Sequence, residues 1–544
     1  MNRLPDRANL DHLKKQAKDL IRAYRARDPK AIAQFRAALP AAASRSDAEI
    51  IALDLRLHDA QSCVARSYGF ASFADLRAYV EAEAGAGSDR AARRLRWFAL
   101  VYAGDISGSV NRANPRVALR MLAENPDLAA GDPYAACAIG DEAALKAATA
   151  TDPAWVNRPG GPLRLPPLLA VTQSSLLRLP EFRARLHACA RHLLASGADP
   201  NQRVGNRWPP ASLREPDEAH PLSALYGAAG VNHDAELTTL LLEAGADPND
   251  GESLYHSLES VACVRALLAH GARIAGSNAI YRVLDLDNLA ALELLLAHGG
   301  NANEPARNAP LTDWGSPLLW AIYRRRSRGH VAALLAAGAS PLATTTAGIG
   351  AHSMALQLGL TDVAALLRQH GALSEDEQFV AACAANDEAE ARRIQARRPD
   401  LPGSLPEARL RCLPDMVAAG GDDGARMMVR LGWPLAVRGG DWSASALNHA
   451  VFRGDAPLAR FLLAHGASWK EQHGFGDNAC GTLSWGSCNE PAADGDWVSC
   501  AKALLEHGLP RAIPDGDDPA WVVVDGRRKL FSDEVREVLL AGAA

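Results

Sequence analysis

The chain has 544 residues, too many for one compact core, and its 48% hydrophobic and 22% charged residues are typical of a folded protein. A formal net charge of -5 gives no overall attraction to nucleic acid or to anionic lipid. Lysine provides eight of the 58 basic residues, a bias that we interpret as the base composition of a bacterial coding sequence.

The first residues contain no apolar stretch of the kind found in secretory signals. No apolar run reaches the roughly 18 to 20 residues that a membrane-spanning helix needs. The nine cysteines lack the paired spacing of a disulfide framework. We therefore expect a cytoplasmic protein that has no contact with a membrane.

Residues 1–84 are predicted to form a small N-terminal helical module. Apolar residues recur at helical spacing in two stretches, at Leu10, Leu13, Ala17, Leu20, Ile21 and Tyr24 and then at Ile32, Phe35 and Leu39. Residues 56–80 indicate two more helices joined at Gly69. Residues 85–94 begin with a run of Gly, Ala and Ser and are expected to form a linker.

From about residue 95 onward, one phrase of two leucines, two variable residues and a glycine recurs. The leucines form the buried stripe of a short helix, and the glycine suits the left-handed residue that closes it. We expect this role for Gly197, Gly245, Gly271, Gly299, Gly338, Gly371, Gly432, Gly466, Gly508 and Gly542. Gly432 and Gly466 are 34 residues apart, as are Gly508 and Gly542. A period of this size predicts a solenoid.

A shorter, Ala-rich helix is expected before each leucine phrase, as in residues 132–140, 378–386 and 445–454. Two helices of this size bury their apolar faces only by stacking on neighbouring pairs. Residues 315–322 (GSPLLWAI) followed by 331–341 (VAALLAAGASP) resemble the ankyrin repeat, whose first helix opens with Thr-Pro-Leu-His-x-Ala. Residues 445–450 and 481–486 match the same place in the repeat.

The resemblance extends over residues 95–544, in about a dozen degenerate units. Residues 1–84 are similar to a helical module that precedes ankyrin repeats in a set of bacterial proteins. The predicted fold class is therefore all-α, an ankyrin-type helical solenoid with a small N-terminal helical module.

The resemblance implies a non-enzymatic scaffold for protein–protein interaction, in which the first helices line a concave groove and the turns project as fingers. We expect a protein partner, no small-molecule substrate, no cofactor and a monomer. Because Trp and Arg are frequent hot spots, Trp320, Trp485 and Arg282 are the predicted anchors. The finger residues Asp313, Trp314, Asp441 and Trp442 join them, together with His449, although a turn Trp can also simply cover the core. The column of histidines is expected to be solvated polar surface.

Two alternatives remain open. Residues 471–507 contain His473, Cys480, Cys488 and Cys500, which suggest a metal or thiol site, but no Cys-x-x-Cys pair is present. Buried thiols are the simpler interpretation. Residues 3–36 carry a net charge of +6, so a basic helix that contacts nucleic acid or an acidic partner is the second alternative. A solvated helix face explains the same charges, and nucleic acid is not the expected partner.

Overall fold

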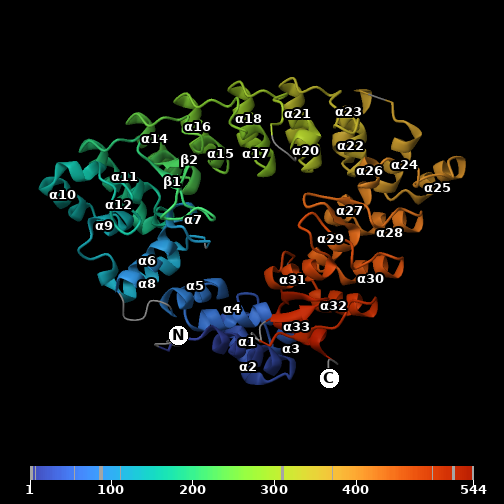
Figure 1. Cartoon of the computed structure of the whole chain (residues 1–544), viewed down its shortest axis with the longest axis horizontal. Helices are drawn as coiled ribbons and strands as arrows, with labels where there is room; N and C mark the ends of the chain where they lie inside the picture. The colour runs from blue at the N-terminus through green and yellow to red at the C-terminus, as the bar shows by residue number, and fades with distance from the viewer. Residues whose placement is uncertain are drawn as a thin grey trace. The chain divides into compact units, whose positions relative to one another are not determined.

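The computed structural model describes residues 4–5, 8–53, 55–84, 90–110, 112–307, 311–370, 372–492, 494–516 and 521–541. The chain divides into two units, residues 1–298 and 299–544. Each unit is a stack of helix pairs in which neighbouring pairs along the chain pack on one another (Figure 1).

The first unit opens with the N-terminal helical module. Its helices are α1 (Leu10–Arg25), α2 (Pro29–Ala38), α3 (Asp47–Ile51), α4 (Leu57–Ser67) and α5 (Phe73–Ala84). The apolar positions predicted for the first two helices form a core of their own, with Ala17 and Phe35 fully buried. Gly69, at φ 81°, separates α4 from α5 as expected, whereas the short α3 follows no periodic pattern.

The module packs on the next helices of the same unit. Residues 90–94, expected in the linker, instead form the start of α6 (Arg90–Val101), which is followed by α7 (Gly104–Ser107) and α8 (Pro115–Glu124). Arg120 of α8 donates to the carbonyl of Tyr68 at 2.9 Å and lies 3.9 Å from the ring centroid of Phe70. Asn114 donates to Asp75 at 2.6 Å. Residues 85–89 of the expected linker lie outside the described residues.

The rest of the first unit consists of paired helices, with short 3-10 and π turns between them. The pairs and turns are η1 (Pro126–Leu128), α9 (Pro133–Ile139), α10 (Glu142–Thr151), η2 (Pro153–Asn157), α11 (Pro167–Thr172), η3 (Ser175–Arg178), α12 (Pro180–Ala195), α13 (Ala224–Tyr226), η4 (Gly227–Val231), α14 (Ala235–Glu243), α15 (Ser253–His256), α16 (Val261–Ala269), α17 (Ala279–Asp285) and α18 (Leu289–Ala297). The strands β1 (Arg203–Asn206) and β2 (Asp217–Ser223) form the longer finger of this unit.

The second unit continues the same pattern. Its helices are α19 (Leu311–Trp314), α20 (Pro317–Tyr323), α21 (Arg328–Ala336), α22 (Ala351–Gln357), α23 (Thr361–Leu367), η5 (Arg368–His370), α24 (Glu375–Ala384), α25 (Glu388–Arg397), α26 (Glu407–Leu410), α27 (Cys412–Ala418), α28 (Asp422–Arg430), α29 (Ala446–Arg453), α30 (Ala456–Ala464), α31 (Ala479–Asn489), α32 (Trp497–Glu506) and α33 (Asp533–Leu540). One continuous apolar core runs from Phe379 to Leu539.

Short strands complete the second unit. The antiparallel pair β3 (Arg438–Gly439) and β4 (Ala444–Ser445) forms one finger. Strands β5 (Ile513–Pro514), β6 (Trp521–Val524) and β7 (Arg527–Leu530) form a small antiparallel sheet before α33. The leucine phrase does not predict this sheet. Among the described residues, no helix combines the length and hydropathy that crossing a membrane requires.

The predicted closing glycines adopt the left-handed conformation. Eight of them have φ between 88° and 99°, namely Gly197, Gly245, Gly271, Gly299, Gly338, Gly432, Gly466 and Gly508. This backbone region penalises any residue with a Cβ, so glycine is required by conformation rather than by space. Gly371 and Gly542 lie outside the described residues.

An asparagine after the glycine joins each of several pairs to the next. Asn249 donates to the carbonyl of Gly271 at 3.2 Å and accepts from the amide of Arg273 at 2.8 Å. Asn201 bonds the following pair in the same way, as does Asn303 in the second unit. The side chain of this asparagine therefore fixes the spacing of adjacent pairs.

Candidate functional site

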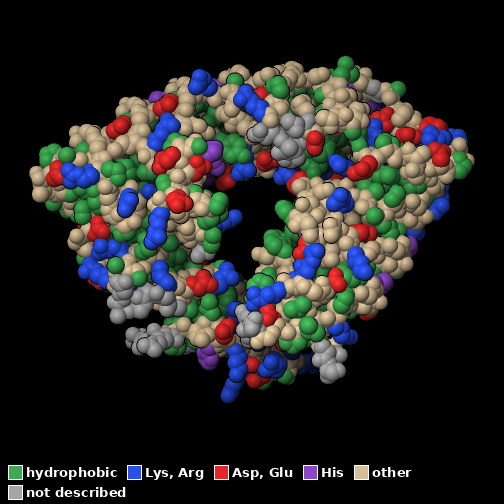
Figure 2. All heavy atoms as spheres, viewed as in Figure 1, with side chains coloured by type: hydrophobic (Ala, Val, Ile, Leu, Met, Phe, Trp, Pro, Cys, Tyr) green, Lys and Arg blue, Asp and Glu red, His purple; other side chains and the backbone are tan. Residues whose placement is uncertain are grey.

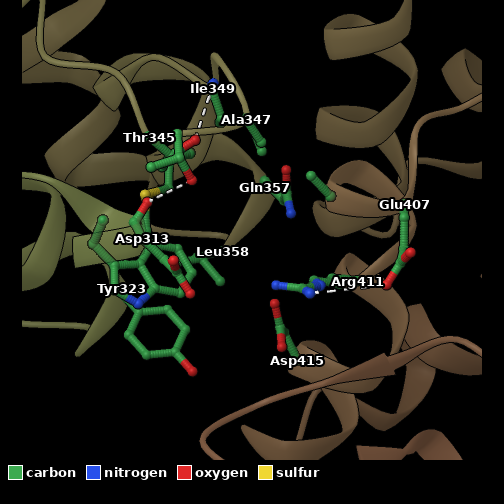
Figure 3. A pocket seen from close by; sticks show the side chains of 14 residues that line it. Asp313, Tyr323, Thr345, Ala347, Ile349, Gln357, Leu358, Glu407, Arg411 and Asp415 are labelled. Carbon is green, nitrogen blue, oxygen red and sulfur yellow. Dashed lines mark hydrogen bonds and ion pairs between the residues drawn. The ribbon is translucent and has the colours of Figure 1, made fainter. Parts of the chain in front are cut away.

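The candidate site is a groove of the second unit that consists of two adjoining cavities. The first cavity has a volume of about 320 Å³ and is lined from α19, α20, α22, α26 and α27 (Figure 3). The second has a volume of about 330 Å³ and is lined from the end of α20, from α27, from the β3–β4 finger and from α29. Tyr323, Leu358 and Asp415 line both cavities. We call the two cavities together the groove.

A pair of aromatic rings forms one wall of the first cavity. The rings of Trp314 and Tyr323 are stacked, with centroids 3.9 Å apart and an interplanar angle of 21°. Gly315, at φ 81°, turns the chain sharply between α19 and α20, and this turn brings Trp314 back onto Tyr323. The carbonyl of Asp313 accepts from the amide of Thr346 at 3.1 Å, which ties the short helix α19 to the loop before α22.

The β3–β4 finger is held across the groove at two points. At its tip, Asp441 accepts hydrogen bonds from the hydroxyl of Tyr323 and from the guanidinium of Arg324, each at 2.9 Å. The amide of Gly440 donates to Asp415 of α27 at 2.7 Å. The finger therefore connects α27 to the end of α20.

Charged groups meet at the centre of the groove. Burial raises the pKa of Asp415 to about 6, although the Gly440 amide and nearby Arg411 act in the opposite direction. Figure 3 shows Arg411 reaching into the first cavity between Glu407 and Asp415. Burial, together with the charges of Asp415 and Asp441, raises the pKa of Tyr323, so its hydroxyl is a hydrogen-bond donor at neutral pH.

The structure brings five of the predicted site residues together around the groove, namely Asp313, Trp314, Asp441, Trp442 and His449. Trp485 lies beside them, because its ring stacks on that of Phe452, a lining residue of the second cavity, with centroids 5.2 Å apart. The Trp485 side chain is 52% exposed. Arg282 belongs to the first unit, where it lies 5.4 Å from the ring centroid of Tyr255.

Two expectations about exposure are wrong. Trp320 is only 5% exposed and belongs to the core of the stack, so it cannot be an anchor on the surface. His449 is 3% exposed rather than solvated, and its Nε2 lies 3.1 Å from the carbonyl of Gly439. Burial lowers the pKa of His449 to about 4, so the ring is neutral and donates to that carbonyl. The ring of Trp320 packs 5.4 Å from that of Tyr323, and the buried ring of His449 lines the second cavity.

Tyr323 and Asp415 carry much of the groove's geometry, although the repeat pattern does not single them out. Tyr323 follows the predicted anchor Trp320 by three residues, and its position at the end of the first helix is the signal that locates it. Asp415 lies on α27, whose sequence has no Thr-Pro-Leu-His-like phrase to align.

The three cysteines of residues 471–507 do not form a cluster that could bind a metal ion. Cys480 and Cys500 are buried, and burial raises the pKa of Cys480 to about 12, which leaves its thiol protonated. Cys488 is exposed at the end of α31. Across the part of the chain that the structure describes, no group of three or more His, Cys, Asp and Glu side chains is placed to hold a metal ion.

The basic segment of the module is partly neutralised within α1. Lys14 lies 3.9 Å from Asp11, and Arg22 lies 3.0 Å from Asp19. Its apolar stripe is buried against α4. On the face of the molecule that Figure 2 shows, basic and acidic side chains are interspersed. These contacts fit a solvated helix face.

No protein-family model matches the chain, and no curated protein matches it. Among solved structures, the chain is similar to the crystal structure of the human ASB11 ankyrin repeat domain, with 18% sequence identity and a TM-score of 0.33. The match covers 45% of this chain and 99% of that domain. At this TM-score the likeness carries no argument about function. The paired helices, left-handed closing glycines and finger hairpins described above give the chain an all-α, ankyrin-like fold.

Proposed function

We propose that the chain is a non-enzymatic scaffold that binds a partner protein through the groove of its second unit and the β3–β4 finger. The observation that carries this proposal is the groove itself, where two adjoining cavities are bordered by the half-exposed rings of Trp314, Tyr323 and Trp442. Aromatic rings of this kind, surrounded by polar and charged side chains, are frequent hot spots of protein–protein binding.

The rigidity of the groove supports the same function. Helices α20, α22, α27 and α29 are fixed by their packing on neighbouring pairs, and Asp441 and Gly440 fix the finger. A partner that docks on such a surface orders few side chains, so little of the contact energy is lost. The exposed ring of Trp485 extends the apolar surface beyond the second cavity.

The test is affinity capture from an extract of the source cells, with mass spectrometry of the captured proteins, using the full chain and two matched variants. Trp485→Ala removes a ring that is 52% exposed beside the groove, and Trp208→Ala removes a ring that is 49% exposed in the first unit. A hot-spot Trp contributes about 2 kcal/mol to binding, which is a loss of about 30-fold. We expect Trp485→Ala to lose the partner and Trp208→Ala to keep it.

A variant inside the groove completes the test. Trp442→Ala removes a ring that lines the second cavity and packs 4.9 Å from the ring of His449. Circular dichroism would verify that the helices are intact in each variant. Capture that survives both Trp442→Ala and Trp485→Ala in folded protein would refute binding through the groove.

A further inference from the structure

The second cavity contains an arginine in an unfavourable backbone conformation. Arg325 has φ 57°, two residues after the end of α20. In the equivalent place the chain has Gly359 at φ 70° after α22 and Gly420 at φ 83° after α27, whereas Asp287 after α17 and Asn386 after α24 each have φ 57°. Arginine is less stable than glycine in this conformation, because its Cβ approaches the following carbonyl oxygen, and it lacks the short polar side chain with which Asp and Asn tolerate it.

The surroundings of Arg325 leave its charge incompletely compensated. Within the described residues, its guanidinium has no hydrogen bond and no ion pair within 4 Å, and Asp415 is the acidic group whose charge acts on it. The walls of the cavity remove water from Arg325 and lower its pKa, although the side chain remains exposed to a partner. A desolvated cation with open donors favours an anionic ligand.

The other arginines that line the cavity have partners of their own. Four arginines and two aspartates line it, namely Arg324, Arg325, Arg326, Arg453, Asp415 and Asp441. Arg324 is paired with Asp441 at 2.9 Å, and Arg453 is paired with Asp422 at 2.8 Å. Arg453 also lies 3.8 Å from Asp455, and Arg326 donates to the carbonyl of Arg324 at 2.9 Å. Arg325 is therefore the cation that this cavity offers to an incoming anion, beside the aromatic rings of Trp442 and Phe452.

We propose that the second cavity binds a glutamate or aspartate side chain from an acidic segment of the partner protein, with Arg325 as the residue that receives it. The proposal rests on the function proposed above and adds the chemistry of the partner. A planar carboxylate matches the guanidinium fork. A long polyanion such as single-stranded nucleic acid fits less well, because Asp441 lies at the rim and the whole chain has a net charge of -5.

The probes for the test are fluorescein-labelled peptides that share a central Leu-Trp pair and carry Glu, Gln or Lys at every other position. A labelled oligothymidylate serves as the nucleic-acid arm. Fluorescence anisotropy with the full chain should give the tightest binding for the Glu peptide, with an affinity that falls as salt is added. Arg325→Gln should weaken this peptide about tenfold, the effect of one charge-assisted hydrogen bond, and should leave the Gln peptide unchanged.

Two further variants separate binding from folding. Arg328→Gln makes the same charge change at an exposed position outside the cavity and should keep the affinity for the Glu peptide. Arg325→Gly should also weaken that peptide about tenfold. Because glycine suits the left-handed position, this variant should keep the Tm of the native chain or raise it.

Three results would overturn the proposal. They are equal binding of the Glu, Gln and Lys peptides, an unchanged Glu-peptide affinity in Arg325→Gln, and tighter Arg325-dependent binding of the oligothymidylate. If the native partner is still lost on Trp485→Ala in that case, the scaffold function stands and only the acidic chemistry is wrong. If Trp485→Ala and Trp442→Ala keep the partner, the scaffold function itself has failed.

Discussion

The hydroxyl of Tyr323 donates a hydrogen bond of 2.9 Å to the carboxylate of Asp441, although the two residues are 118 positions apart in the chain. This contact holds the tip of the β3–β4 finger to the end of α20 and so borders the second cavity. A finger that is fixed before binding presents its side chains at a smaller entropic cost.

Removing this one hydroxyl should loosen the finger. Tyr323→Phe keeps the ring that stacks on Trp314 and deletes the donor to Asp441. We expect faster amide hydrogen exchange at residues 438–445 and a loss of stability of about 1 kcal/mol or less, because the pair is exposed. Tyr255→Phe is the matched control, since the hydroxyl of Tyr255 has no hydrogen bond among the described residues. Equal exchange in the two variants would contradict the role of the contact.

The closing glycines should be sensitive to a single methyl group. Gly466 has φ 99°, and an added Cβ would meet no atom within 4 Å, so Gly466→Ala tests the backbone conformation alone. We expect a loss of about 1 kcal/mol, measured as a lower urea midpoint. Gly516→Ala is the control, because Gly516 also has open space but does not have a left-handed φ. A similar midpoint for both variants would show that conformation is not the reason for the glycine.

The asparagine link between pairs can be divided into its two hydrogen bonds. Asn249→Ala removes both the donor to Gly271 and the acceptor for Arg273, whereas Asn249→Asp keeps the acceptor alone. At about 0.5–1.5 kcal/mol for each hydrogen bond, we expect Ala to lower the free energy of unfolding about twice as much as Asp. Chemical denaturation of both variants would measure this ratio, and an unchanged stability in Asn249→Ala would refute the link.

Asp415 and His449 should make the free energy of unfolding depend on pH in opposite directions. The folded pKa of Asp415 is about 6 and its ordinary value is 3.8, so the folded chain takes up this proton first and stability rises as pH falls through 6. The folded pKa of His449 is about 4 and its ordinary value is 6.5, so the unfolded chain takes up that proton first and stability falls.

Single variants separate the two effects. Because Asp415→Asn removes the gain, its urea midpoint should fall more steeply than that of the native chain between pH 6 and 4. His449→Gln removes the loss and leaves the gain from Asp415, so its midpoint should rise relative to that of the native chain as pH falls from 6.5 to 4. Arg325, Arg411 and Asp441 also act on Asp415, whereas Asp441, Arg453 and His473 act on His449. Parallel curves for the native chain and both variants would contradict the assigned environments.

The sequence predicts those features that depend on neighbours along the chain. The conformation of Gly466 and the ends of α29 at Ser445 and Gly454 follow from local turn and capping chemistry, and the structure confirms them. Short strands such as β6 and β7 escape prediction, because four residues are too few to show a clear alternation.

Burial in the short first helices is harder to predict. Trp320 is a predicted anchor for the partner, yet α20 has only seven residues and is packed against α19, α21 and α22. Contacts on several sides bury Trp320, whereas periodicity describes only one buried face. The contact of Asp441 with Tyr323 depends on how several pairs stack, so no local pattern contains it.

Hydrogen exchange of the full chain with and without its captured partner tests directly whether the partner binds in the groove. Binding in the groove predicts protection at residues 323–326 and 438–445, on the end of α20 and the β3–β4 finger. The outer helices α21 and α30 of the same pairs should exchange as they do in the free chain. Protection confined to α21 and α30, or to the first unit, with none at the groove, would contradict binding in the groove.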